Sequence, residues 1–215
     1  MDMEARQGST RERLLRVAEE MFARNGFAGT SFRDMGAALG IANASITHHF
    51  PSKRKLYAAV LSRVAESVRQ VTGHLGEDAS DPVERIRLMV DRVAAWGEAN
   101  PAYMQLIVRE LMENPGRISR VRTLYLANVV DALRRPIDQA KSQGYLRDLD
   151  PELFLLHLIG AVSYFTIAAP TIGRITKIPD LGELRSRFRA SLHRIVTACV
   201  DGTSDRAAPS GTRDT

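Results

Sequence analysis

Apolar side chains recur every three to four residues near the start of the chain, a spacing that predicts short amphipathic α-helices. The first helix begins at a capping-box pattern, Ser9-Thr10-Arg11-Glu12, and ends at Asn25-Gly26. A second capping box, Ser31-Phe32-Arg33-Asp34, opens another helix that Gly40 ends. The apolar positions expected to face inward from these two helices are Leu14, Val17, Ala18, Met21, Phe22, Phe32, Met35 and Leu39.

A third short helix follows almost at once. It begins near Ala42 or Asn43, and Ile46 and Phe50 lie four residues apart on its inward face. Two short helices joined by a tight turn that contains glycine, packed on a longer first helix, are the plan of a helix-turn-helix.

The rest of the chain continues the helical periodicity and shows no strand pattern that persists. Ser52 can cap a long helix, and the pairs Asp81-Pro82 and Asp150-Pro151 open two others. The expected helices after Pro51 cover residues 52–72, 82–100, 102–113, 118–143, 153–169 and 181–199, with a loop over 170–179. The last helix carries the apolar stripe Leu181, Leu184, Phe188, Leu192, Ile195 and Cys199. The sequence therefore predicts an all-α protein.

Three segments follow from this pattern. Residues 1–52 form the expected three-helix helix-turn-helix domain, and residues 53–201 form a C-terminal helical bundle. Residues 202–215 are small and polar, a composition typical of a disordered tail.

Composition limits the possible partners and compartments. A formal charge of +5 and a pI near 9.7 favour an anionic partner such as nucleic acid or an acidic membrane surface. The single cysteine and the absence of metal-ligand spacing fit a reducing cytoplasm and no metal or other cofactor. The polar N-terminus lacks the apolar core of a secretory signal. The apolar run 153–169 is shorter than the roughly 20 residues of a membrane-spanning helix, so we expect a buried helix and no membrane.

An enzyme would need a nucleophile with its base, a carboxylate pair or a phosphate loop. None of the motifs GxSxG, HExxH, GxxxxGK and GxGxxG occurs, and Cys199 lies on an apolar stripe without a sign of activation. We therefore expect no enzymatic activity. A second alternative is an architectural DNA-binding protein without a sensor, although the bundle has no further basic cluster to support it.

From Thr30 to Leu56 the sequence reads TSFRDMGAALGIANASITHHFPSKRKL. This segment resembles the tetracycline-repressor (TetR) family of bacterial regulators in Thr30, Met35-Gly36, Gly40-Ile41, His49-Phe50 and Pro51-Ser52-Lys53. Two positions depart from the family pattern: Ala44 replaces a frequent glycine, and Thr47 replaces a frequent tyrosine that touches the DNA backbone. The resemblance implies a DNA-binding transcription regulator, usually a repressor.

The candidate DNA contacts come from both short helices. Side chains early in the second helix of such a unit meet base edges in the major groove. Cations in the first turn of the helix that follows, at 53–55, oppose its dipole, and a nearby phosphate would relieve them. The resemblance makes Lys53 a backbone-contacting residue. Metal binding by His48 and His49 is disfavoured, because adjacent helical residues point in different directions. The candidate DNA-binding residues are Thr30, Ser31, Arg33, Asn43, Ala44, Ser45, Thr47, His48, His49 and Lys53.

The C-terminal bundle is expected to bind a ligand and to dimerise. The resemblance implies a homodimer through the last two helices, bound to double-stranded operator DNA and released by a small-molecule effector. The helix over 153–169 is apolar nearly all round, which a second copy would explain. His157 and Glu110 are candidate polar anchors for a mostly apolar ligand, although a protein partner would also satisfy them. The full candidate set, most of which ordinary core packing would also explain, is Met89, Trp96, Tyr103, Ile107, Glu110, Tyr125, His157, Tyr164 and Phe165.

Overall fold

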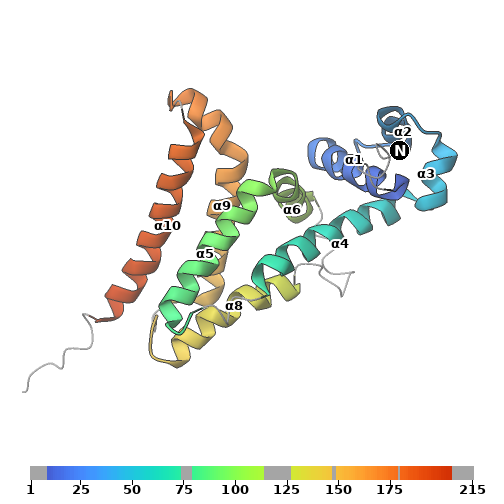
Figure 1. Cartoon of the computed structure of the whole chain (residues 1–215). Helices are drawn as coiled ribbons and strands as arrows, with labels where there is room; N and C mark the ends of the chain where they lie inside the picture. The colour runs from blue at the N-terminus through green and yellow to red at the C-terminus, as the bar shows by residue number, and fades with distance from the viewer. Residues whose placement is uncertain (1–8, 74–78, 114–126, 147–148, 179, 205–215) are drawn as a thin grey trace, which may run out of the picture. The chain divides into compact units, whose positions relative to one another are not determined.

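A computed structural model describes residues 9–73, 79–113, 127–146, 149–178 and 180–204 (Figure 1). Within these residues every regular element is an α-helix, which confirms the all-α prediction. The helices are α1 (Thr10–Asn25), α2 (Phe32–Leu39), α3 (Asn43–His49), α4 (Lys53–Thr72), α5 (Pro82–Ala99), α6 (Pro101–Glu113), α8 (Ala127–Ser142), α9 (Pro151–Ile175) and α10 (Leu181–Ser204).

Contacts divide the described residues into two compact units. Of the described residues, the first unit draws on 9–68 and 99–113, so it contains α1 to α3, most of α4, and α6. The second unit draws on those in 69–98 and 128–204 and contains α5, α8, α9 and α10. The boundary expected after residue 52 separates roles in binding and stays a prediction. The structure adds that α6 packs in the unit of the N-terminal helices.

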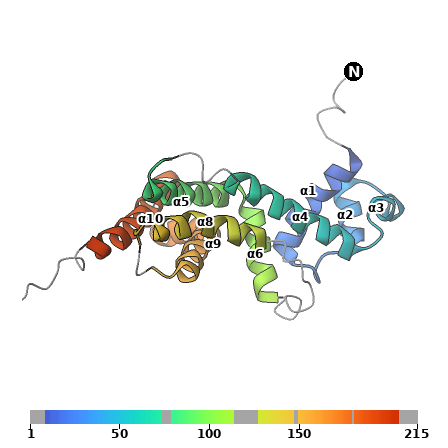
Figure 2. The same ribbon diagram turned by 90° about the horizontal axis from the view of Figure 1, so that it is seen from below.

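The first unit is built around α1. Its N-cap is Ser9, whose hydroxyl oxygen accepts a hydrogen bond from the Glu12 amide at 3.3 Å, and Gly26 at φ 71° ends the helix. Leu14 and Phe22 are fully buried, as the apolar periodicity requires. α1, α2 and α3 gather around the first turns of α4 (Figure 2).

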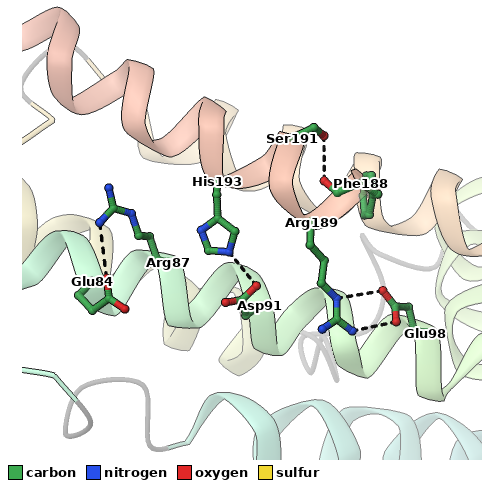
Figure 3. A network of polar contacts seen from close by, with 8 residues as sticks. All are labelled: Glu84, Arg87, Asp91, Glu98, Phe188, Arg189, Ser191 and His193. Atoms are coloured by element: carbon green, nitrogen blue, oxygen red, sulfur yellow. Dashed lines mark hydrogen bonds and ion pairs between the residues drawn. The ribbon is translucent and has the colours of Figure 1, made fainter. Parts of the chain in front are cut away.

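The second unit buries one face from each of its helices. Ile86 and Met89 of α5 and Ile137 of α8 are fully buried, and Leu158 of α9 and Val196 of α10 nearly so. Polar contacts also join α5 to α10, and Figure 3 shows two of them. Arg189 pairs with Glu98 at 2.8 Å, and the His193 ring lies 2.8 Å from the Asp91 carboxylate. Because these side chains are partly exposed, the contacts fix the register of the two helices more than they stabilise the fold.

Two predicted helix ends are wrong. α9 does not stop before Pro170 but continues through it to Ile175. Proline costs a helix one backbone hydrogen bond, and here the long apolar run around Pro170 outweighs that loss. α10 extends to Ser204, beyond the expected start of the tail at residue 202. The expected helix start at 118 and residues 205–215 lie outside the described residues.

The stripe predicted on the last helix is partly wrong. Leu192 is 5% exposed, but Ile195 is 52% exposed, and Val196 is buried in its place. Leu192 and Val196 are four residues apart, so the buried line follows the four-residue spacing of the helix rather than the three-residue step to Ile195.

Candidate nucleic-acid interface

Local hydrogen bonds define α2 and the turn that follows it. The Ser31 hydroxyl accepts from the Asp34 amide at 3.2 Å and donates to the Asp34 carboxylate at 2.6 Å, which caps α2. Gly40 ends the helix in the left-handed region at φ 67°, and the Ile41 amide donates to the Gly36 carbonyl at 3.0 Å. The serine N-cap and the glycine stop predicted from the sequence are both confirmed.

Gly36 allows α2 and the turn to approach closely. A Cβ atom at this position would lie 2.8 Å from the Ile41 carbonyl oxygen and 3.3 Å from the Asn43 side-chain oxygen. Since side chains do not tolerate 2.8 Å against backbone oxygen, glycine at residue 36 sets how near the start of α3 lies to α2.

The inward face of the motif is apolar, as predicted. Met35 of α2 and Ile46 of α3 are fully buried, and Phe50 is 5% exposed. α3 begins at Asn43 after Ala42, which supplies no side-chain cap. The orientation of α3 therefore depends on its buried residues and on the turn rather than on a capping hydroxyl.

The outward face of α3 is polar and open. Asn43, Ala44, Thr47 and His48 are exposed, while Ser45 and His49 are half-buried. The Thr47 hydroxyl donates to the Ala44 carbonyl at 3.0 Å, which leaves its oxygen free to accept. These side chains lie together on a short helix whose opposite face is buried in the core.

The structure changes the view of the residues before α2. Thr30 is 1% exposed, and its single hydroxyl proton is shared between the Gly26 carbonyl at 2.8 Å and the Met21 carbonyl at 3.2 Å. The hydroxyl therefore holds the end of α1, and contact with DNA would require both bonds to break. Ser31 is occupied by its cap, whereas Arg33 is exposed.

Lys53 also has a structural role that the sequence did not indicate. Its ammonium donates to the Phe27 carbonyl at 2.7 Å and the Thr30 carbonyl at 2.8 Å, and lies 4.5 Å from the centre of the Phe27 ring. The two carbonyls compensate the cation in the first turn of α4. One of its three N–H donors is left for a phosphate oxygen.

Aromatic side chains pack around Phe27, the ring that the Lys53 ammonium contacts. The Tyr57 ring lies 4.9 Å from Phe22 and 5.2 Å from Phe27, centre to centre. The Tyr57 hydroxyl donates to the Glu110 carboxylate at 2.7 Å. Glu110, a candidate ligand anchor, is thus paired with α4 inside the first unit.

Two arginines that the sequence analysis missed fasten α1 to its neighbours. Arg63 of α4 pairs with Glu12 at 2.5 Å and with Glu19 at 2.9 Å. Arg109 of α6 donates to the Ala23 carbonyl from Nε and to the Arg24 carbonyl from Nη2, both at 2.7 Å. Arg109 therefore caps the carboxyl end of α1, where free carbonyls attract cations.

Glu19 carried the one signal that could have revealed this cluster. It falls on the apolar face of α1 and is 8% exposed, an unusual burial for a carboxylate. Burial raises the pKa of Glu19, and the charge of Arg63 opposes that shift. Burial and the nearby Glu19 charge also raise the pKa of Tyr103, a candidate ligand residue on α6. No comparable sequence signal marks Arg109.

The candidate ligand residues do not form one group. Tyr103, Ile107 and Glu110 belong to the first unit, and the remaining described candidates belong to the second. Met89 and Trp96 are buried on one face of α5 at 0% and 7% exposure. Tyr125 lies outside the described residues.

The candidates on α9 differ in environment. Tyr164 is 70% exposed and His157 is also exposed, so neither lines the interior of its own unit. In the single chain the His157 side chain reaches solvent, so its role as a polar anchor stays a prediction. Phe165 stacks on Phe188 of α10, with ring centres 4.0 Å apart, and holds α9 against α10.

A helix pair with a locked apolar face and an open polar face, joined by a left-handed glycine turn, defines a helix-turn-helix DNA-binding regulator. Residues 14–60 match the sequence model described as "Bacterial regulatory proteins, tetR family". The chain carries the N-terminal DNA-binding domain of the TetR family of transcriptional regulators, followed by a helical C-terminal region. Members of this family are transcription factors and not enzymes, and they bind operator DNA and effector ligands.

Burial raises the pKa of the Cys199 thiol, the opposite of what a nucleophile needs.

Curated relatives are similar over most of the chain. The nucleoid occlusion factor SlmA of Aliivibrio fischeri (strain MJ11) is 23% identical over 160 residues, which cover 73% of this chain and 82% of the relative. The HTH-type transcriptional repressor NicS of Pseudomonas putida is 24% identical over 161 residues, which cover 73% and 74%. The solved structure of the TetR-family regulator PfmR from Thermus thermophilus superposes with a TM-score of 0.68 at 21% identity, covering 88% of this chain and 96% of that one.

α9 is longer than the sequence suggested. With 25 residues from Pro151 to Ile175, it is long and apolar enough to cross a membrane by length and composition alone. The core helix of a soluble protein can be equally long and apolar, so the absence of a membrane partner remains a prediction.

Proposed function

We propose that the protein is a cytoplasmic, homodimeric repressor that leaves a palindromic operator when a small, mostly apolar effector binds its C-terminal helices. Residues 1–52 read the operator, and residues 53–201 bind the effector and the second copy. The open polar face of α3, backed by fully buried Ile46, is the observation that carries the proposal.

Base reading is assigned to α3. Asn43, Ser45, Thr47 and His48 offer hydrogen-bonding groups of the kinds that read base edges in a major groove, and His49 lies beside them half-buried. Ala44 supplies a methyl group for apolar contact with a base.

Phosphate contacts are assigned to the residues around α3. Arg33 is exposed at the start of α2, and the remaining N–H of Lys53 is available to a phosphate oxygen. Ser31 is the N-cap of α2, so its backbone lies at the start of the helix, near Arg33. Thr30 is left out of the contact set, because its hydroxyl is buried and bonded to α1.

The effector is assigned to the second unit. Met89 and Trp96 lie on one buried face of α5 and offer an apolar wall, and Phe165 of α9 belongs to the same unit. NicS, the relative described as a repressor, supports repression rather than activation as the mode of regulation.

The test selects a duplex from a random pool and measures its binding by fluorescence anisotropy. An inverted repeat with half-site centres about 34–36 Å apart, or a multiple of this distance, is expected because a two-fold dimer presents both α3 helices to the same side of the duplex. A panel of fatty acids, steroids and aromatic acids is then added. Release of the operator, together with a change in the fluorescence of Trp96, supports the proposal. Specific binding that no effector changes would favour an architectural or effector-independent protein.

A further inference from the structure

One face of α9 exposes large apolar side chains. Leu153 is 53% exposed, Leu156 67%, Tyr164 70% and Ile167 41%. Their spacing places them on one stripe of the helix, here called the α9 stripe. No acidic residue, lysine or arginine occurs between Leu153 and Gly173. Soluble proteins rarely leave an apolar, uncharged stripe of this kind in contact with water.

Gly160 lies at the centre of the α9 stripe. Leu156 and Tyr164 lie four residues to either side of it, and Leu153 and Ile167 lie seven residues to either side. Gly160 is exposed, and a Cβ atom there would meet nothing within 4 Å. Since glycine weakens a helix and the chain's own packing does not require it here, its role lies in contact with something else.

We propose that the α9 helices of two protomers cross antiparallel at Gly160, on the two-fold axis of the dimer. Leu156 then packs against the partner subunit's Tyr164, and Leu153 packs against the partner subunit's Ile167. The inference rests on the proposed dimer and adds its register.

The arrangement of the α9 stripe supports a second copy as the occupant. At a two-fold axis each residue meets its own copy, and residue pairs exchange across the interface. In an antiparallel pair, a residue before the crossing point meets the residue equally far after it, which the symmetric spacing about Gly160 satisfies. An uncharged stripe avoids the repulsion between like charges that self-association would bring. Glycine at the crossing point lets the two backbones approach closely.

A lipid bilayer fits the surroundings of the α9 stripe less well. Phe165 of α9 stacks on Phe188 of α10, so α10 would accompany α9 into the membrane. α10 exposes Arg185, Arg187 and Arg194, and cations in the hydrocarbon region are costly.

Cysteine cross-linking tests the register in the full chain, starting from Cys199→Ser, which removes its only cysteine. Gly160→Cys should cross-link with its own copy. The single variants Leu156→Cys and Tyr164→Cys should not cross-link, because in the antiparallel pair each residue lies about 12 Å along the helix axis from its own copy in the other protomer. The double variant should cross-link, because Leu156→Cys of one protomer then meets Tyr164→Cys of the other. A disulfide requires Cα atoms roughly 4.4–6.8 Å apart. Ile172→Cys, exposed on α9 but about 120° around the helix from Gly160, is the matched control and should stay uncross-linked.

A second variant measures the contact without a cross-link. Gly160→Leu fills open space in its own chain, so helicity by circular dichroism should persist, while the dimer dissociation constant rises about tenfold or more. Light scattering and sedimentation supply the masses. A dimer that cross-links at Ile172→Cys and not at Gly160→Cys overturns the register alone. A monomer that binds operator with undiminished affinity overturns the proposed dimer as well, and flotation of the wild type with phosphatidylcholine–phosphatidylglycerol vesicles would assign the α9 stripe to lipid instead.

Discussion

Replacing Lys53 with methionine separates two roles of one ammonium group. The change keeps the aliphatic stem and removes the hydrogen bonds to the Phe27 and Thr30 carbonyls, at 2.7 and 2.8 Å. Hydrogen bonds to charged groups contribute about 1.5–3 kcal/mol each, and the half-buried site places both near the lower end. With about 0.5–1 kcal/mol from the contact to the Phe27 ring, the expected loss in free energy of unfolding is about 3.5–4 kcal/mol. In a chain of this length that lowers the melting temperature by roughly 7–16 °C.

The DNA-binding role is measured separately, through the salt dependence of binding. If the third N–H of Lys53 reaches a phosphate in each protomer, Lys53→Met weakens binding to operator and random duplexes alike and lowers the log–log salt slope by about 0.9 per protomer, or about 1.8 for the proposed dimer. Lys55→Met, in the same turn but exposed, is the control for stability and should change the free energy of unfolding by less than about 0.5 kcal/mol. An unchanged melting temperature would refute the structural role, and an unchanged slope would refute the phosphate contact.

Three further variants test other parts of the first unit. Gly36→Ala places a Cβ 2.8 Å from the Ile41 oxygen and should cost operator affinity about 1–3 kcal/mol by displacing α3, measured by anisotropy beside a melting curve. Arg109→Gln removes the cap on α1 and should lower stability by about 1–3 kcal/mol in urea; a loss no larger than that of Arg185→Gln, an exposed control, would contradict it. Because burial raises the pKa of Glu19, its charged form opposes folding, so wild-type stability relative to Glu19→Gln should fall as pH rises above the ordinary glutamate value of 4.5. A relative stability that rises over the same pH interval would show that pairing with Arg63 outweighs burial.

The helix-turn-helix could be predicted closely because its signals are local. The serine caps, the Gly40 stop and the apolar pair Ile46 and Phe50 act within a few residues of one another, and all of them hold in the structure. The continuation of α9 through Pro170 was missed because a local rule, that proline ends a helix, was outweighed by the apolar run around it.

The supporting contacts of the site could not be predicted in the same way. Arg109 meets carbonyls 85 and 86 residues away, and Lys53 meets carbonyls 23 and 26 residues away. Backbone carbonyls leave no trace in side-chain patterns, so a lysine that meets carbonyls and one that meets phosphate look alike in sequence. Thr30 shows the same ambiguity, since a threonine before a helix can face DNA or hold the preceding helix, and only its burial distinguishes the two.

The grouping of α6 with α1 to α4 bears on the exchange of operator specificity between regulators. A chimera joined just after α3 or within α4 would bring a foreign α6 against α1, and the carbonyls of Ala23 and Arg24 would lose their Arg109 partner. Tyr57 would likewise face a residue other than Glu110. The DNA-binding unit that could be transferred to another regulator is therefore discontinuous in sequence. A graft that keeps both its fold and its specificity must carry Pro101–Glu113 together with the N-terminal helices.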